Sequence, residues 1–192
     1  SLVGSEMCIR DSNVELPVQV TIASGFPKGD KLEFITQKVT ELGASQIWAF
    51  PADWSVAKWD GKKLGKKVEK LEKIALGAAE QSKRNFVPSI TLFEKKADFL
   101  AQLSQFDRIV VAYEESAKEG ESAALIQAVA GLEKGAKLLF IFGPEGGLSP
   151  AEIESFEAKG AVLAGLGPRI LRAETAPLYA LSALSVLLEL EK

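Results

Sequence analysis

Short apolar runs alternate along the chain with longer segments in which apolar residues recur every three or four positions. The first pattern predicts buried strands and the second predicts amphipathic helices. Strands that alternate with helices are typical of an α/β fold in which helices connect parallel strands. The predicted strands are 18–23, 46–50, 89–93, 108–113, 137–142 and 161–166, and the predicted helices are 30–42, 64–78, 95–103, 121–132, 150–159 and 176–190.

Two segments are apolar beyond what one buried face requires. Every residue of 137–142 after Lys137 is apolar, which predicts a strand covered on both faces inside a parallel sheet. The helix 176–190 is apolar on most of its sides. In a soluble protein this pattern predicts burial in a core or in a subunit interface.

Two of the predicted helices begin at capping signals. Asp30 and Glu33 form an Asp-x-x-Glu start. Ser149, Pro150 and Glu152 supply an N-cap, a proline at the first helical position and a capping-box acid. Two loops, 143–147 and 166–175, follow predicted strands at their carboxyl ends, where open parallel sheets bind ligands.

The composition excludes several classes of protein and of site. The chain has 192 residues, 47% of them hydrophobic, which suits one globular domain. The single cysteine, Cys8, excludes an internal disulfide framework and favours a reducing compartment. The absence of histidine removes the commonest general base and any site that needs a histidine metal ligand, so we expect no metal. Without an apolar run of membrane length, we expect a soluble, cytoplasmic protein.

Charge is unevenly distributed along the chain. The formal net charge is −3, yet the segment 62–84 carries eight lysines and arginines against three glutamates. This predicts a helix with a basic outer face, either an ordinary solvated surface or a surface for nucleic acid.

The two ends of the domain are also predicted. Residues 1–15 are interpreted as a non-native or disordered leader, because 1–12 has neither an initiator Met nor the pattern of a signal peptide. Residues 16–192 are expected to form one domain, in which 115–122 is the one candidate linker.

Three segments carry candidate chemistry. The glycine-rich loop 143–147 is either a tight turn or a cradle in which backbone amides approach a ligand. The loop 166–175 combines arginines, an acid and apolar residues, which fits either a pocket rim or surface ion pairs. The segment 80–85 is either a solvated charge run or a set of phosphate and base contacts.

Five motifs together resemble one family. They are Phe-Pro-Lys-Gly-Asp at 26–30, Thr-Glu-Leu-Gly at 40–43, Glu-Gln-Ser-Lys-Arg-Asn at 80–85, Phe-Gly-Pro-Glu-Gly-Gly-Leu-Ser-Pro-Ala-Glu-Ile at 142–153 and Leu-Gly-Pro-Arg-Ile-Leu-Arg-Ala-Glu-Thr-Ala at 166–176. In this order they resemble the RsmE family of ribosomal RNA methyltransferases, part of the SPOUT superfamily. The resemblance runs from about Val18 to the end of the chain.

The resemblance implies a parallel-sheet α/β methyltransferase domain with a C-terminal trefoil knot. It implies S-adenosylmethionine as cofactor, N3 of a uridine in 16S rRNA of the small ribosomal subunit as the methyl acceptor, and a homodimer. Family members also carry an N-terminal PUA-like domain. The chain has no room for it before Val18, so we expect that domain to be missing.

The resemblance also assigns roles to residues. Arg172 and Arg84 are predicted to steady the uracil or its phosphate, and Glu174 is predicted either to accept the proton or to pair with Arg172. The residues predicted to hold the cofactor are Gly143, Glu145, Gly146, Leu166, Gly167, Ile170 and Leu171.

Two positions depart from the family pattern. Ala173 stands where the family often has Thr, and Trp54 stands where it often has Arg. The first change removes a hydroxyl from the predicted pocket rim, and the second removes one expected RNA contact. A second function stays open, that of a non-catalytic RNA-binding or scaffold protein that retains the knotted fold. The basic helix and the expected absence of the N-terminal domain favour it, whereas the glycine loop and the Arg-Ile-Leu-Arg segment at 169–172 count against it.

Overall fold

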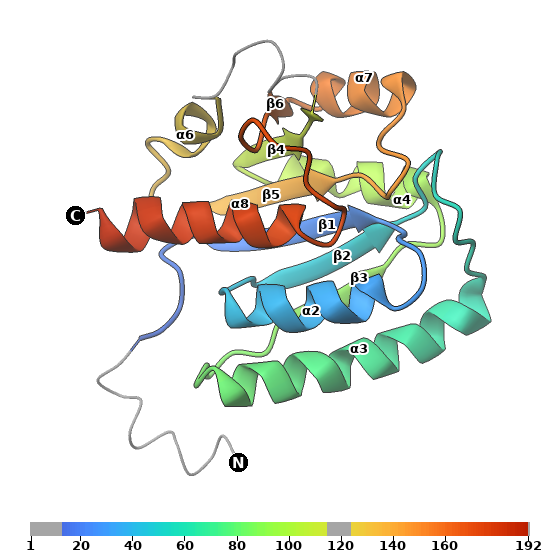
Figure 1. Cartoon of the computed structure of the whole chain (residues 1–192), viewed down its shortest axis with the longest axis horizontal. Helices are drawn as coiled ribbons and strands as arrows, with labels where there is room; N and C mark the ends of the chain where they lie inside the picture. The colour runs from blue at the N-terminus through green and yellow to red at the C-terminus, as the bar shows by residue number, and fades with distance from the viewer. Residues whose placement is uncertain (1–12, 115–123, 192) are drawn as a thin grey trace.

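A single six-stranded sheet, with every strand parallel to its neighbours, organises the molecule (Figure 1). The computed structural model describes residues 13–114 and 124–191. The strand order is β3-β2-β1-β5-β4-β6. The strands are β1 (Gln19–Gly25), β2 (Gln46–Phe50), β3 (Ser89–Leu92), β4 (Arg108–Ala112), β5 (Lys137–Phe142) and β6 (Val162–Ala164).

The helices cover both faces of this sheet. They are α2 (Lys31–Glu41), α3 (Gly61–Gln81), α4 (Lys96–Ala101), α6 (Ala124–Val129), α7 (Pro150–Ala158) and α8 (Ala176–Ser185). A short 3₁₀ turn, η1 (Leu103–Gln105), follows α4, and a π-helical turn, η2 (Val186–Leu190), extends α8. The predicted α/β class with a parallel sheet is confirmed.

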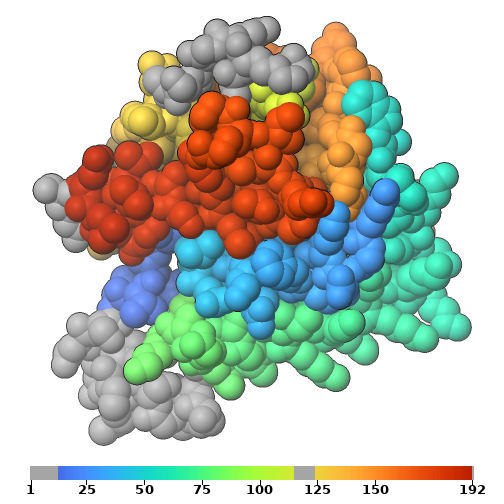
Figure 2. Space-filling view, in the orientation of Figure 1, coloured from blue at the N-terminus to red at the C-terminus, as the bar shows by residue number. Residues whose placement is uncertain are grey.

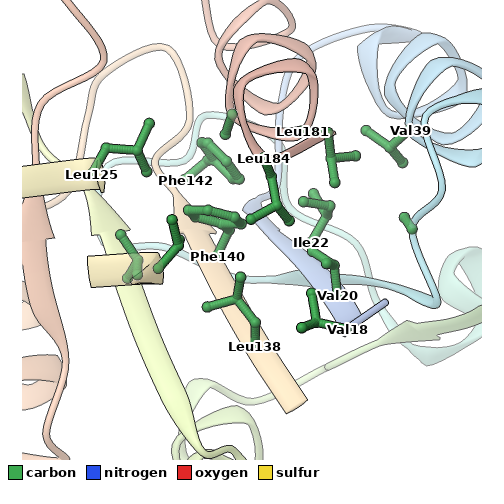
Figure 3. Packing of buried hydrophobic residues seen from close by; sticks show 14 of the residues in the cluster. Val18, Val20, Ile22, Val39, Leu125, Leu138, Phe140, Phe142, Leu181 and Leu184 are labelled. Carbon is green, nitrogen blue, oxygen red and sulfur yellow. The ribbon is translucent and has the colours of Figure 1, made fainter. Parts of the chain in front are cut away.

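The alternation of side chains along β5 shows how the two faces are filled. Leu138 and Phe140 face one side, where they pack with residues of α2, α6 and α8 (Figure 3). Leu139 and Ile141 face the other side, where they pack with residues of α4 and α7. All four side chains are buried. Because helices cover both faces, a continuous apolar strand is stable here, as the sequence predicts.

The position of α8 brings the end of the chain to the middle of the sheet. After β6, at one edge of the sheet, the chain returns across β4 and β5 and packs α8 next to α2 (Figure 2). Leu181 and Leu184 are buried in the core between the helix and the sheet. The predicted burial in a core is confirmed for one face of α8, whereas no residue of η2 is buried. The trefoil knot stays a prediction.

One of the two predicted helix starts forms as expected. Ser149 Oγ accepts from the N–H of Glu152 at 3.1 Å, and Glu152 Oε1 accepts from the N–H of Ser149 at 2.9 Å. Asp30 makes no such cap, because its backbone is not extended and its side chain makes no capping hydrogen bond. Glu33 pairs instead with Lys67 on α3, at 3.7 Å.

Some predictions concern residues outside the described ranges. These are the leader over 1–12, the linker 115–122 and the first turn of the helix predicted at 121–132, of which α6 is the described part. Within 13–114 and 124–191, no helix is both long and apolar enough to cross a membrane. The same residues contain no cluster of three or more potential metal ligands.

Candidate functional site

A pocket of about 1060 Å³ opens at the carboxyl edge of the sheet. Its walls come from the loops that follow β2, β4, β5 and β6, and Lys31 at the start of α2 completes the rim. Loops at this edge are where open parallel sheets bind ligands. The two loops singled out in the sequence, after β5 and after β6, therefore lie together.

The structure brings most of the predicted site residues to this pocket. Arg172 lines it, as does Arg169 from the same loop. All seven residues predicted to hold the cofactor line it as well: Gly143, Glu145, Gly146, Leu166, Gly167, Ile170 and Leu171.

The glycine loop after β5 is too tight for side chains at two positions. A Cβ on Gly143 would lie 2.9 Å from the carbonyl carbon of Gly147 and 3.0 Å from the nitrogen of Leu148, both fixed backbone atoms. A Cβ on Gly146 would lie 3.1 Å from the carbonyl oxygen of Trp54. The first glycine lets the loop fold back on itself, and the second lets the loop after β2 approach.

Glu145 ties this loop to the Phe-Pro-Lys-Gly-Asp motif at 26–30. The N–H of Lys28 donates to Glu145 Oε1 at 2.8 Å, and Lys31 Nζ lies 3.1 Å from the same oxygen. Burial opposes ionisation of this carboxyl. The hydrogen bond from Lys28 and the charge of Lys31 outweigh burial and hold the pKa of Glu145 below its ordinary value.

Glu174 stands beside the pocket rather than in its wall. Its Oε2 lies 3.6 Å from Lys31 Nζ and has no hydrogen-bond partner within the described structure. Of the two predicted alternatives for Glu174, pairing with Arg172 is not seen among the described residues. The cation beside Glu174 is Lys31.

The predicted role of Arg84 at the reacting base is corrected by its position. The guanidinium is 2% exposed and lies at the amino edge of the sheet, away from the pocket. Nη1 donates to the carbonyl oxygens of Thr40 and Ala44, both at 2.9 Å. Nε and Nη2 donate to the carboxylate of Glu15 at 3.0 and 2.5 Å. Arg84 thus joins α3 to the end of α2 and to the segment before β1.

Glu15 belongs to the segment that the sequence analysis assigned to the leader. In the structure, Glu15 forms an ion pair with Arg84. The Thr-Glu-Leu-Gly and Glu-Gln-Ser-Lys-Arg-Asn motifs, at 40–43 and 80–85, therefore meet at a structural contact rather than at the pocket.

Sequence reasoning missed the network that fixes the loop after β2. Asp53 accepts from Ser149 Oγ at 2.5 Å and from the ammonium of Lys96, and its N–H donates to Glu152 Oε2 at 3.1 Å. The hydrogen bonds from Lys96 and Ser149 hold the pKa of Asp53 below its ordinary value. No signal in the sequence alone brings Asp53 to the start of α7, because the two are far apart along the chain.

Comparison with known proteins identifies the family. Residues 14–185 match the RNA methyltransferase domain family. The chain belongs to this family. It is 55% identical, over 180 residues, to ribosomal RNA small subunit methyltransferase E of Bacillus subtilis (strain 168), covering 94% of this chain and 70% of the relative. The resemblance inferred from the five motifs is therefore confirmed.

More distant relatives support the same family assignment. The methyltransferase of the same name from Mycobacterium tuberculosis (strain CDC 1551 / Oshkosh) is 31% identical, covering 88% of this chain and 63% of the relative. The chain thus spans about two thirds of the length of these relatives. A crystal structure of ribosomal RNA small subunit methyltransferase E from Neisseria gonorrhoeae, bound to S-adenosyl methionine, superposes with a TM-score of 0.76 at 27% identity. That match covers 92% of this chain and 69% of the other.

Proposed function

We propose that this chain transfers the methyl group of S-adenosylmethionine to N3 of a uridine in 16S rRNA of the small ribosomal subunit. The observation that carries the proposal is the convergence of all seven predicted cofactor residues on one pocket. Support comes from the relatives named as small-subunit rRNA methyltransferases and from the related crystal structure that holds the cofactor.

The pocket suits this cofactor in size and in lining. Small-molecule sites commonly measure about 300–1,000 Å³, with mostly apolar walls and a few convergent polar groups. Leu166, Ile170 and Leu171 supply apolar surface, and Gly143 lines the pocket in a loop that folds back on itself where a Cβ would not fit. When bound, the cofactor supplies an activated methyl group on a sulfonium sulfur.

The chain's own residues supply position and charge. Methyl transfer to a ring nitrogen is an in-line displacement, so alignment of the two reactants accounts for much of the rate. As the N3 proton leaves, negative charge develops on the uracil carbonyl oxygens. Arg172 in the pocket wall is the cation that we assign to this charge. Glu174, which stands beside the pocket wall and has a buried oxygen without a hydrogen bond to the described residues, is the proposed proton acceptor.

We also propose a homodimer that works in the cytoplasm, where ribosomal subunits are found. The apolar side chains of Tyr179, Val186 and Leu190 are 38%, 47% and 74% exposed along the final helix. A second copy of the chain is the partner that would cover them.

Two measurements test the proposed function. Calorimetric titration with S-adenosylmethionine is expected to show binding, and radiolabelled methyl groups are expected to reach the uracil base of 16S rRNA in small subunits that lack the modification. Arg172→Ala should keep cofactor affinity within a few fold and lose transfer, whereas Lys159→Ala, exposed at the end of α7 and outside the pocket, should keep both. Cofactor binding without transfer to any rRNA would favour the scaffold alternative.

A further inference from the structure

Trp54 differs from the other two tryptophans in its surroundings. Trp48 is 4% exposed in the core, and the Trp59 ring packs against Phe26, with ring centroids 4.5 Å apart, and under Lys67. Trp54 lines the pocket and is 49% exposed. It is a large aromatic surface at the mouth of the site with nothing stacked on it among the described residues.

The backbone that carries Trp54 is held in place. The preceding residue, Asp53, is bound to Ser149, to Lys96 and to the buried Glu152. On the other side, Trp54 packs so closely on Gly146 that a Cβ there would lie 3.2 Å from the Trp54 Cβ. The loop position is therefore fixed before a ligand arrives, and stacking on the indole costs little ordering entropy.

The charges around the same rim indicate the class of ligand. Lys31, Arg169 and Arg172 line the pocket together with Trp54. Cations beside an exposed aromatic ring suit single-stranded nucleic acid, whose phosphates bind the cations and whose bases stack on the ring.

We propose that Trp54 forms a stacking subsite for a nucleobase of the RNA substrate. The inference rests on the proposed function, since it names the part of the pocket that receives RNA. Trp54 follows β2, and β1 separates β2 from β5 in the sheet. The loops that carry the predicted cofactor residues follow β5 and β6, and β6 is an edge strand. We therefore expect the RNA base to enter from the β2 side and the cofactor to lie between the loops after β5 and β6.

Binding of a single-stranded oligoribonucleotide that carries the substrate uridine tests the subsite. Stacking of one base on an aromatic ring is worth about 1–3 kcal/mol, so Trp54→Ala should weaken RNA affinity by about 5- to 150-fold. Trp54→Phe, which keeps an aromatic face, should restore most of that affinity. Phe86→Ala is the matched control, because Phe86 is 47% exposed and does not line the pocket.

Tryptophan fluorescence supplies a second readout. RNA should quench the emission of the parent protein, and this quenching should be absent from Trp54→Phe, while calorimetric affinity for S-adenosylmethionine stays unchanged in Trp54→Ala. The subsite alone is overturned if folded Trp54→Ala binds and methylates RNA as the parent does. It is also overturned if S-adenosylmethionine alone quenches Trp54 and the alanine variant loses cofactor affinity. A parent protein that binds cofactor but no RNA overturns both the subsite and the proposed function.

Discussion

Lys31 Nζ lies 3.1 Å from Glu145 Oε1, and this ion pair joins the start of α2 to the glycine loop after β5. Both side chains are less than a third exposed. The pair closes one side of the pocket, so the protonation state of Glu145 affects both the stability and the shape of the site.

This ion pair predicts a specific response to acid. The pKa of Glu145 is lowered by the Lys28 N–H and by Lys31 against the opposing effect of burial. A lowered pKa stabilises the folded state above the ordinary carboxyl value, and that stabilisation is lost as the pH falls through the lowered pKa. In Lys31→Met the pKa of Glu145 is lowered less, so the loss of stability in acid should be smaller and should be complete at a higher pH than in the parent, as measured by the thermal unfolding midpoint across an acidic pH series. Lys38→Met removes a comparable pair with Glu41, remote from the pocket, and should leave the acid response as in the parent.

Arg84→Met should destabilise the fold without touching the site. The substitution leaves the Glu15 carboxylate and the carbonyls of Thr40 and Ala44 without their donor, and breaking a buried ion pair in this way typically costs about 3–5 kcal/mol. Urea unfolding measures the loss, and calorimetry on the folded protein should give parental affinity for S-adenosylmethionine. Arg169→Met, at the pocket rim, should show the reverse pattern of full stability and weakened RNA binding. A selective loss of methyl transfer in folded Arg84→Met would restore the catalytic role that the structure argues against.

Gly143→Ala should reduce cofactor affinity by at least tenfold. The added methyl would lie 2.9 Å from the Gly147 carbonyl carbon and 3.0 Å from the Leu148 nitrogen, which is closer than van der Waals contact allows. The loop must therefore move. Gly65→Ala is the matched control, because a Cβ on Gly65 meets open space on α3 and alanine favours a helix by about 1 kcal/mol. Calorimetric titration of both variants checks this prediction, and equal affinities would show that the loop does not hold the cofactor.

Charge reversal of Lys66, Lys70 and Lys73 should weaken RNA binding and leave cofactor binding alone. All three are exposed on α3, and Lys70 also lies 3.9 Å from Glu33. Binding to phosphates releases counterions, so the triple Glu variant should show a shallower dependence of RNA affinity on salt. Filter binding across a salt series measures this slope. If the variant retains the parental slope, the basic face of α3 is an ordinary solvated surface.

Leu190→Glu should produce monomers if the final helix forms the dimer interface. Leu190 is 74% exposed, so the charge disturbs an interface without entering the core. Leu187 and Leu188 are poorer choices, because both pack against the core cluster. Ile126→Glu, at a 54% exposed position on α6, is the control that should leave the oligomeric state unchanged. Sedimentation velocity at micromolar concentrations distinguishes these outcomes.

Local signals in the sequence predict much of the fold. Strands 46–50 and 137–142 agree with the structure residue for residue, and the capping box of Ser149 and Glu152 forms as predicted. Asp30 does not cap α2, since its backbone is not extended, and Glu33, its expected partner, pairs with Lys67 on another helix. A tertiary contact of this kind leaves no trace in local spacing.

The candidate site also has parts that local sequence signals predict and parts that depend on tertiary contacts. The two pocket loops were predictable because each follows an apolar strand, and because one is rich in glycine and the other combines arginines and an acid with apolar residues. Arg84 and Asp53 were not, because their roles depend on which distant segment lies against them. Arg84 and Arg172 are both arginines within motifs of the family. Only the structure distinguishes them, since Arg84 is buried away from the pocket and Arg172 lines it.

The pairing of β1 with β5 affects how the protein can fold during its synthesis on the ribosome. β1 can complete its central place in the sheet only after β5 has been synthesised, and α8, which follows β6 in the chain, contributes Ala176 to the pocket wall. Contacts between segments so distant along the chain form slowly, because the entropy of closing a long loop is lost before any of these contacts stabilises the fold. A nascent chain therefore has no finished pocket in which cofactor could assist its folding, and binding can stabilise the domain only after the whole of it has emerged.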